Sequence, residues 1–394
     1  MSSTAGDVAG RSTPVFLSQG FRPFFLAAGL WAATALAIWI VMFVTGLALP
    51  SRFDPLDWHI HEMLFGFVMA AIAGFLLTAI PNWTHRLPVR GAPLAVLAGL
   101  WLLGRIACLV SLLIPTWLAL AADLSFPVVL VAVVARELIA GRNWRNLPMI
   151  VAVTVLGLAN LLMHLDADDI GDVPSGLGWR LGLVAVIVFI SVVAGRIVPS
   201  FTRNWLAKSG NPNLPVAHGR VDRIALGVLH TGLIGWVFFP DRLVVGVLLL
   251  LGAALNLWRL MRWRGAATVS EPLLFILHIG YAWLVLGVAS LGLSILDADF
   301  EPGAAIHALT AGAAGTMILA VMTRATRGHT GHDLSADRAT SLIYVLVTLA
   351  ALTRIIAAFS SDWTMPLLIT SACLWIAAFR LFVLYYGRML LLKA

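Results

Sequence analysis

Twelve apolar stretches, each about 20 residues long, divide this chain and restrict what it can fold into. They are centred near residues 35, 70, 102, 128, 155, 188, 230, 252, 284, 314, 350 and 378. A stretch of this length and polarity suits a helix that crosses the hydrocarbon core of a bilayer. Because only 11% of the residues are charged and the mean hydropathy is +0.95, we expect lipid to be the solvent for the whole chain.

Short connections between the stretches predict an all-α polytopic membrane protein, a bundle of about 12 transmembrane helices. Residues 1–20 are expected to form a short cytoplasmic segment, and residues 21–394 a single twelve-helix transmembrane domain. No cleavable signal is expected, because the first 20 residues lack an apolar core. Cys108 and Cys373 each fall inside an apolar stretch and are interpreted as core residues.

The positions of the charges predict the orientation. Most of the 26 Lys and Arg residues fall on the side of the N-terminus and the even-numbered connections, whereas Arg52, Arg180 and Arg242 fall on the opposite side. The acidic stretches 166–172 and 297–301 lie on that arginine-poor side. By the positive-inside rule, both termini are cytoplasmic. The net charge of +7 therefore reflects topology, and no nucleic-acid partner is expected.

Polar residues gather in one slab of the predicted membrane, in the outer part of six helices. A charge near a helix centre costs roughly 2.5–3.5 kcal/mol on insertion scales, so these residues are expected to face the bundle interior and to meet partners or a ligand. The alternative is that helix ends simply tolerate polar residues. The slab contains His59, His61, Glu62, Arg105, Asp123, Asn160, His164, His307 and Arg354.

The second apolar stretch opens on two histidines and a glutamate. Residues 54–57 (DPLD) predict a helix N-terminus, so the histidines that follow are already helical. Helical rotation places His59 and His61 about 200° apart, with Glu62 and Met63 on the face of His59. Two neighbouring sites, or one ligand and one supporting residue, are therefore favoured over one ion bound by both histidines.

A second, inner group of histidines lies nearer the predicted cytoplasmic face. His278 is interpreted either as a ligand or as a hydrogen-bonded core residue, and both interpretations stay open. His230 is interpreted as a core residue, and His329 lies just past the inner end of the tenth stretch. The remaining loop histidines are expected to be solvated; these are His85, His218 and His332.

Several imidazoles inside a membrane are typical of haem iron, copper or non-haem iron. Small residues after His307 leave space for a flat macrocycle, although they equally allow close helix packing. Arg105 and Arg354 are suited to bind haem propionates, because guanidinium matches carboxylate in a bidentate way. Glu62 is suited to relay protons. Redox chemistry on a small lipid-soluble substrate is indicated, while a channel or a transporter stays open.

Phrases along nearly the whole chain resemble the NnrS family, bacterial twelve-helix membrane proteins described as haem- and copper-containing and associated with nitric-oxide metabolism and nitrosative stress. The phrases are FRPFF (21–25), HIHEMLFGF (59–67), AIPNWT (79–84), GRIVPSFTRN (195–204), HIGYAW (278–283), HALTAGAAGTM (307–317) and VMTRATRGHTG (321–331). His85 and His332 depart from the pattern, which has glycine and arginine there, and both are discounted as ligands.

Carried over by position, the resemblance implies haem b held by histidines, with copper or non-haem iron as a second metal. It marks His59, His61, Glu62, Arg196, His278, His307, Arg324 and His329. We predict Glu62 as the catalytic group. The predicted metal ligands are His59, His61, His164, His278, His307 and His329. The predicted cofactor-binding residues are His59, His61, His278, His307, Arg105 and Arg354.

Together, the residues and the resemblance predict a protein of the bacterial inner membrane that acts on nitric oxide. The reaction favoured is that of a nitric-oxide reductase: reduction of NO to N2O with electrons from a quinol or another membrane donor, in defence against nitrosative stress or in denitrification. One rival is a protein that binds NO or an iron–nitrosyl species without turnover. The other is a transporter for a metal or a nitrosyl-iron species.

Overall fold

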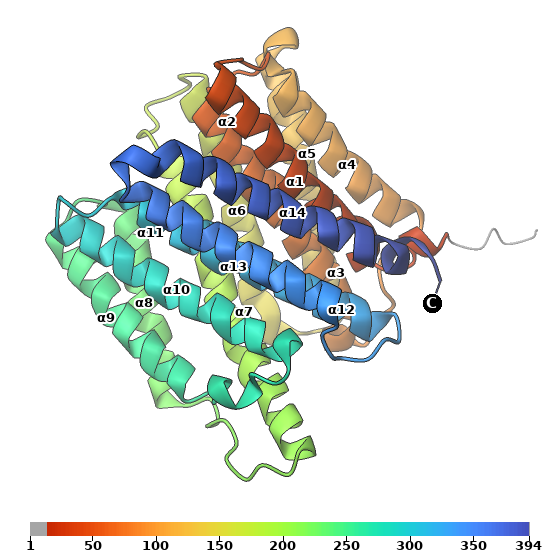
Figure 1. Ribbon diagram of the computed structural model, residues 1–394. Helices are drawn as coiled ribbons and strands as arrows, with labels where there is room; N and C mark the ends of the chain where they lie inside the picture. The colour runs from red at the N-terminus through yellow and green to blue at the C-terminus, as the bar shows by residue number, and fades with distance from the viewer. Residues whose placement is uncertain (1–13, 394) are drawn as a thin grey trace, which may run out of the picture.

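The computed structural model describes residues 14–393 and is all-helical, with 81% helix and no strand in that range (Figure 1). Within it, 12 spans are long and apolar enough to cross a membrane. The prediction of an all-α polytopic bundle is confirmed. Residues 1–13 of the expected N-terminal segment lie outside the described residues. The orientation and the division at residue 20 stay predictions.

Ten of the twelve spans are built around one long α-helix each. These helices are α1 (Phe21–Thr45), α4 (Ala92–Leu109), α5 (Thr116–Ala140), α6 (Leu147–Ala167), α7 (Leu177–Lys208), α8 (Arg220–Phe238), α9 (Leu243–Met261), α10 (Pro272–Leu296), α13 (Arg338–Ala358) and α14 (Thr364–Leu391). The second span consists of α2 (Pro55–His61), the π-helical segment η2 (Glu62–Val68) and α3 (Met69–Thr84). The tenth consists of α11 (Pro302–His307), the π-helical segment η6 (Ala308–Gly315) and α12 (Thr316–His329).

Both ends of the described chain lie on one side of the bundle (Figure 1). Arg22, at the start of α1, donates from one guanidinium nitrogen to the carbonyls of Met389, Leu390 and Leu392, each at 3.0 Å. These carbonyls end α14 and have no partner in their own helix, so the contact joins the first span to the last. We call this side the terminal face, and the side where α1 ends and α2 begins the far face.

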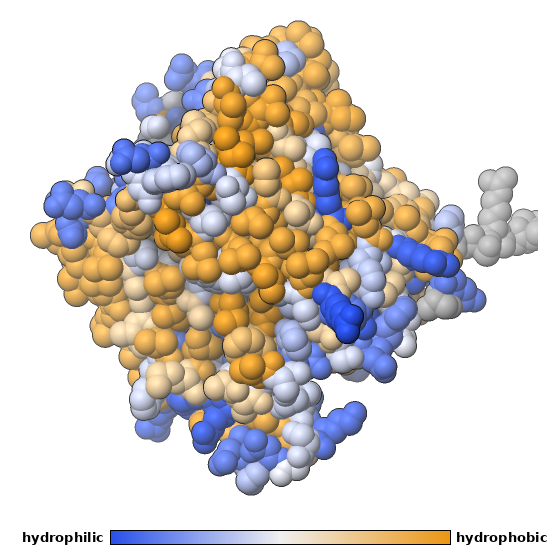
Figure 2. Space-filling view, in the orientation of Figure 1, coloured by the Kyte–Doolittle hydropathy of each residue, from blue (hydrophilic) through white to orange (hydrophobic). Residues whose placement is uncertain are grey.

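Burial separates the spans into two groups. The second, sixth, ninth and tenth spans are 78%, 67%, 72% and 72% buried over their most apolar windows, whereas the other eight are at most 44% buried. The four buried spans therefore form the interior of the bundle, and the others face outward with one side. Figure 2 shows that apolar side chains cover most of the visible face, as lipid contact requires. The histidines of the second and tenth spans are thus carried by interior helices.

Candidate metal and cofactor site

Two π-helical segments stand out in the interior, because π-helices are rare and are frequently found at functional sites. η2 begins at Glu62, directly after His61, and η6 begins at Ala308, directly after His307. Each segment therefore follows a histidine that the sequence marked as a ligand. The N-terminus of α2 forms as predicted, because the Asp54 side chain accepts hydrogen bonds from the backbone of Leu56 and Asp57.

A cavity of about 310 Å³ lies between the two π-containing spans near the far face. His59, His307 and Arg354 all line it, so the structure brings together three of the residues predicted from sequence. We call it the histidine cavity. The rest of its wall is mostly apolar and comes from five spans; among the lining residues are Trp39, Met63, Phe67, Trp179, Ala311, Ala314, Ser371 and Trp375.

The two histidines of this cavity differ in their partners. The Nδ1 atom of His59 is buried and has no hydrogen-bond partner, while the His59 ring stacks on Trp39 with 4.3 Å between the ring centres. The Nδ1 atom of His307 lies 2.8 Å from the carbonyl oxygen of Gly303. A carbonyl only accepts, so Nδ1 carries the proton there and the Nε2 atom of His307 keeps its lone pair.

Six further polar residues form a separate group beside this cavity, which we call the polar cluster. They are His61, Glu62, Arg105, Asp123, Asn160 and His164. All six are buried, with at most 5% of any residue exposed. They come from the second to the fifth spans. His59 and His61 therefore lie in two neighbouring regions, which is compatible with both predicted alternatives, two sites or one ligand and one supporting residue.

Asp123 is the centre of the polar cluster. One of its carboxylate oxygens, Oδ2, lies 3.1 Å from the Nε2 atoms of both His61 and His164 and accepts a hydrogen bond from Asn160 at 2.9 Å. The other oxygen, Oδ1, pairs with the guanidinium of Arg105. A buried carboxylate is stable only when it is paired and hydrogen-bonded, and Asp123 meets both conditions.

Glu62 belongs to the polar cluster and not to the histidine cavity. Its Oε1 accepts from Arg105 at 2.8 Å and lies 3.1 Å from Nδ1 of His61, and its Oε2 accepts from Trp31 at 2.7 Å. His59 and Glu62 both contact α1, since the His59 ring stacks on Trp39 and Glu62 accepts from Trp31, but only His59 lines the histidine cavity. Arg105 and Trp31 offer the donors that hold Glu62 in the polar cluster, and helical rotation alone does not predict such partners.

Four side chains of this region could hold one metal ion. The ligand atoms of His61, Cys108, Asp123 and His164 all lie within 4.8 Å of one another, and all four residues are buried. Among residues 14–393 no other set of three or more His, Cys, Asp or Glu side chains converges in this way. Cys108 is buried, as predicted, whereas Cys373 is exposed, so the interpretation of Cys373 as a core residue is wrong. The place of Cys108 beside potential metal ligands was missed. The available signal was its position one helical turn after Arg105.

The predicted inner histidines lie apart from both regions. His278 on α10 is buried, and its Nε2 lies 2.9 Å from the hydroxyl of Thr202. His329 is exposed and stacks on Phe21, with 5.5 Å between ring centres. His230 pairs with Ser191 at 2.9 Å, as a core histidine would. The loop histidines are exposed, as expected; these are His85, His218 and His332.

The fold and the two polar regions define a polytopic helical membrane protein with a buried histidine-lined cavity and a buried cluster able to bind a metal. The chain matches the NnrS protein family over residues 15–393, nearly its whole length. It therefore belongs to the NnrS family, which is linked to the response to nitric oxide, and the resemblance identified from the sequence phrases is confirmed. No curated protein gives a significant match to the chain.

Proposed function

We propose that this protein binds nitric oxide at a haem b held in the histidine cavity, with His59 and His307 as candidate ligands. The observation that carries the proposal is the buried Nδ1 of His59, which has no hydrogen-bond partner. A buried polar atom without a hydrogen-bond partner costs about 1–3 kcal/mol. A ligand bound in the cavity would supply the partner that the Nδ1 atom of His59 lacks. A haem is the partner that best suits a cavity lined by two histidines and an arginine.

The environment of His307 supports the same proposal. Metal-binding histidines almost always donate their other ring N–H to a carbonyl, a carboxylate or water, which fixes the ring and its tautomer. The contact of His307 Nδ1 with the Gly303 carbonyl has this form. The backbone of α11 thereby holds His307 with an unprotonated nitrogen available, before any ligand binds.

The other walls of the cavity suit the remaining parts of a haem. Arg354 lines the cavity and can pair with a propionate carboxylate. Ala311 and Ala314 line it beside His307 without filling it, so a flat ring has room there. Arg105, which was also predicted to bind propionates, is already paired with Glu62 and Asp123. A haem bound here supplies an iron that coordinates NO and exchanges electrons.

We assign the second metal to the polar cluster and propose that it is copper. A thiolate with two imidazoles is a donor set that suits copper, and Cys108, His61 and His164 provide it with Asp123 alongside. Arg105 pairs with both Asp123 and Glu62 and offsets one of their two negative charges. His59 and His61 are two residues apart on α2, so the two proposed metal sites lie close together.

The reaction that we propose for this pair of sites is the reduction of NO. Two NO molecules, two electrons and two protons give one N2O and one water, with the N–N bond formed and one N–O bond broken. A membrane quinol would supply both the electrons and the protons. Glu62 was predicted to relay those protons, and its contacts with His61 and Arg105 give a hydrogen-bonded path through the polar cluster.

The rival function, NO binding without turnover, is favoured by one specific observation. Both carboxylate oxygens of Glu62 are occupied, and Glu62 does not line the histidine cavity. A proton held there has no direct contact with a molecule bound between His59 and His307. In this case the protein would protect other metal centres by holding NO or an iron–nitrosyl species.

The deciding experiment is a reduced-minus-oxidised spectrum with metal analysis of the purified protein, followed by NO titration with quinol and measurement of N2O. Steady N2O formation would establish reduction. A haem–NO spectrum without N2O would establish binding alone. Absence of haem and metal would overturn the proposal and favour transport, which uptake of metal into vesicles would test.

Variants assign the two sites separately. We expect His59→Ala and His307→Ala to lose haem, whereas His218→Ala, an exposed histidine, keeps it. Cys108→Ser should lose copper and keep haem, and Cys373→Ser, an exposed cysteine, should keep both. A folded His59→Ala, His307→Ala double variant with an unchanged haem spectrum would show that these residues are not the ligands.

A further inference from the structure

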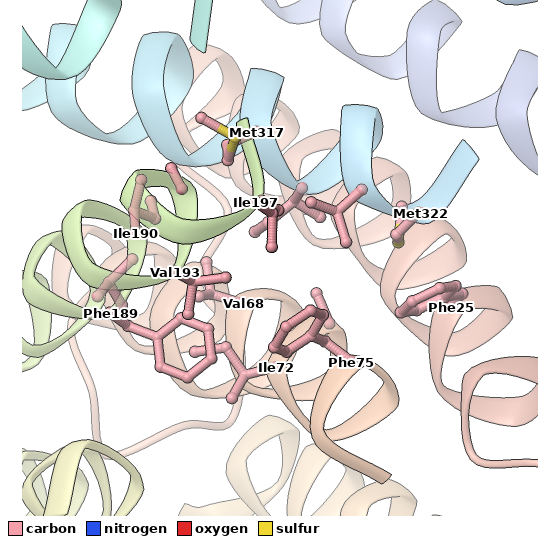
Figure 3. Close-up of a pocket in the computed structure, with 15 residues that line it drawn as sticks. Phe25, Val68, Ile72, Phe75, Phe189, Ile190, Val193, Ile197, Met317 and Met322 are labelled. Atoms are coloured by element: carbon pink, nitrogen blue, oxygen red, sulfur yellow. The ribbon is translucent and has the colours of Figure 1, made fainter. Parts of the chain in front are cut away.

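A second cavity lies between α1, α3, α7 and α12, and its lining is entirely apolar (Figure 3). Its volume is about 50 Å³. Figure 3 shows side chains of α1, α3, α7 and α12 facing one another around it. We call it the apolar cavity. Its lining includes Phe25, Ile72, Phe75, Phe189, Ile190, Val193, Ile197, Met317 and Met322.

The apolar cavity continues the histidine cavity along three helices. Val68 and Val186 line both cavities. On α7, Leu183 lines the histidine cavity, and Ile190, about two turns further on, lines the apolar one. On the tenth span, Ala314 lines the first cavity, and Met317 lines the second. The two spaces are therefore stacked end to end, with the apolar one nearer the terminal face.

Size and polarity limit what the apolar cavity can hold. A cavity with only apolar walls stays dry, because water needs two to four polar partners. An engineered cavity of about 150 Å³ accepts benzene or xenon, so a space of about 50 Å³ is too small for a quinone ring. A small uncharged gas molecule suits both the volume and the walls.

The apolar cavity also reaches toward lipid. Phe75, Val193, Ile197 and Val321 line it and are only half-buried, unlike the fully enclosed side chains of the core. A diatomic gas dissolves in the hydrocarbon of a bilayer and can approach from that side. A charged or strongly hydrated molecule would lose its water there and gain no polar contact in return.

We propose that the apolar cavity binds small uncharged gas molecules and is the route by which NO passes from the bilayer to the histidine cavity. The second half of this statement rests on the proposed function. The first half does not, because it concerns only the walls of the cavity. Val68 and Val186 form the junction through which a gas molecule would pass.

Xenon tests the cavity without haem or NO. We expect purified protein in lipid nanodiscs to bind xenon, as followed by 129Xe NMR, and Ala194→Leu to abolish the binding, because Ala194 lines only the apolar cavity. Ala253→Leu is the matched control, since Ala253 is also buried but lines neither cavity. No xenon binding by the wild type, as expected if an acyl chain fills the space, or equal binding by Ala194→Leu, would overturn the proposal.

Kinetics test the route. After flash photolysis of the reduced NO complex, Ala71→Leu and Ala194→Leu should slow bimolecular rebinding about threefold or more, with the spectrum unchanged. Ile197→Ala, which widens the lipid-facing wall, should speed it, so the test survives if the filled variants fail to fold. If the rate of NO rebinding is unchanged in all three variants, NO does not reach the histidine cavity through the apolar cavity. If no haem–NO complex forms, the proposed function fails, while the xenon result still decides the cavity.

Discussion

Two buried polar regions of this molecule are both built around an Arg–Asp ion pair with an asparagine, but only one of them lies beside a cavity. The first is the polar cluster with the histidine cavity near the far face. The second, which we call the Arg259 network, consists of Asp222, Asn256, Arg259 and Tyr281 on α8, α9 and α10. Arg259 donates to Asp222 at 3.0 Å and to the hydroxyl of Tyr281 at 2.7 Å, and that hydroxyl donates to Asn256 at 2.7 Å.

The Arg259 network is closed by packing. The guanidinium lies over the rings of Trp263 and Tyr281, at 5.1 and 5.7 Å from their centres. A Cβ atom on Gly195 would overlap this guanidinium, so the glycine of GRIVPSFTRN is explained by close helix packing. Neither the histidine cavity nor the apolar cavity touches the network. A cavity and an unpartnered atom together, as at His59, therefore distinguish a candidate ligand site from a polar network that is satisfied by its own packing.

Arg259→Ala should give the largest effect on stability. The substitution removes the closer ion pair of Asp222 and leaves this buried carboxylate with only the longer contact to Arg262, which costs about 3–5 kcal/mol. Haem and metal content per folded molecule should stay unchanged, because the network touches neither site. Thermal unfolding in detergent, with cofactor analysis of the folded fraction, measures both quantities.

Arg262→Ala is the matched control for that variant. Arg262 contacts the same Asp222 at 3.5 Å, but its side chain is 19% exposed, so we expect a loss below about 1 kcal/mol. If the folded fraction of Arg259→Ala lacks haem, the contrast between the two regions is wrong, because the Arg259 network would then support the cofactor site.

Glu62→Gln should have an intermediate effect. The amide keeps the size of the carboxylate but loses the charge that pairs with Arg105, which we expect to cost about 1–3 kcal/mol. The haem spectrum should stay intact, because Glu62 lies outside the histidine cavity. If Glu62 relays protons, N2O formation slows at an unchanged NO affinity. A normal rate in the folded variant would remove Glu62 from the proton route.

His278→Ala tests the predicted inner ligand. Its hydrogen bond with Thr202 alone is worth about 0.5–1.5 kcal/mol, so a structural role predicts a small loss of stability and nothing else. The NnrS resemblance predicts in addition that one metal or haem per chain is lost. Thr202→Val removes the same hydrogen bond and keeps the imidazole. An unchanged cofactor count in His278→Ala would assign His278 to packing.

The sequence was sufficient to predict the twelve spans and the slab of polar residues, because length, hydropathy and charge act locally along the chain. It did not predict how the slab divides. Arg354 joins His59 and His307, whereas Arg105 joins His61 and Asp123. That division depends on which helices are neighbours. Helical periodicity predicts which residues share one face of a helix, but it does not predict which other helix packs against that face.

The π-helical segments and Cys108 show the same limit. A π-turn changes the rotation of every following residue, yet the letters of η2 and η6 carry no local signal for it. Cys108 looked like a core residue because its neighbours in sequence are apolar, whereas its neighbours in space include Asp123 and His164. Residues whose role depends on contacts between distant helices were therefore the ones missed.

The smallest predicted effect concerns an ion pair between the end of the tenth span and the residue before the eleventh, which gives a reference for the buried ion pairs. Asp337 precedes α13 and pairs with Arg327 at 2.9 Å, with 33% of its side chain exposed. Asp337→Asn should cost less than about 1 kcal/mol at pH 7, far less than Arg259→Ala, because water screens the pair.

The pH dependence of this effect has a definite sign. Burial alone would raise the pKa of Asp337, but hydrogen bonds from Tyr385, Thr340 and Arg327 outweigh it and hold that pKa below its usual range. A carboxylate of this kind stabilises the fold above its unfolded pKa of about 3.9, and the contribution is lost as the pH falls through the folded value. The unfolding midpoints of wild type and Asp337→Asn should therefore differ at pH 7 and converge as the pH falls below about 4. A difference that persists in acid would show that the substitution disturbs packing and does not report the ion pair.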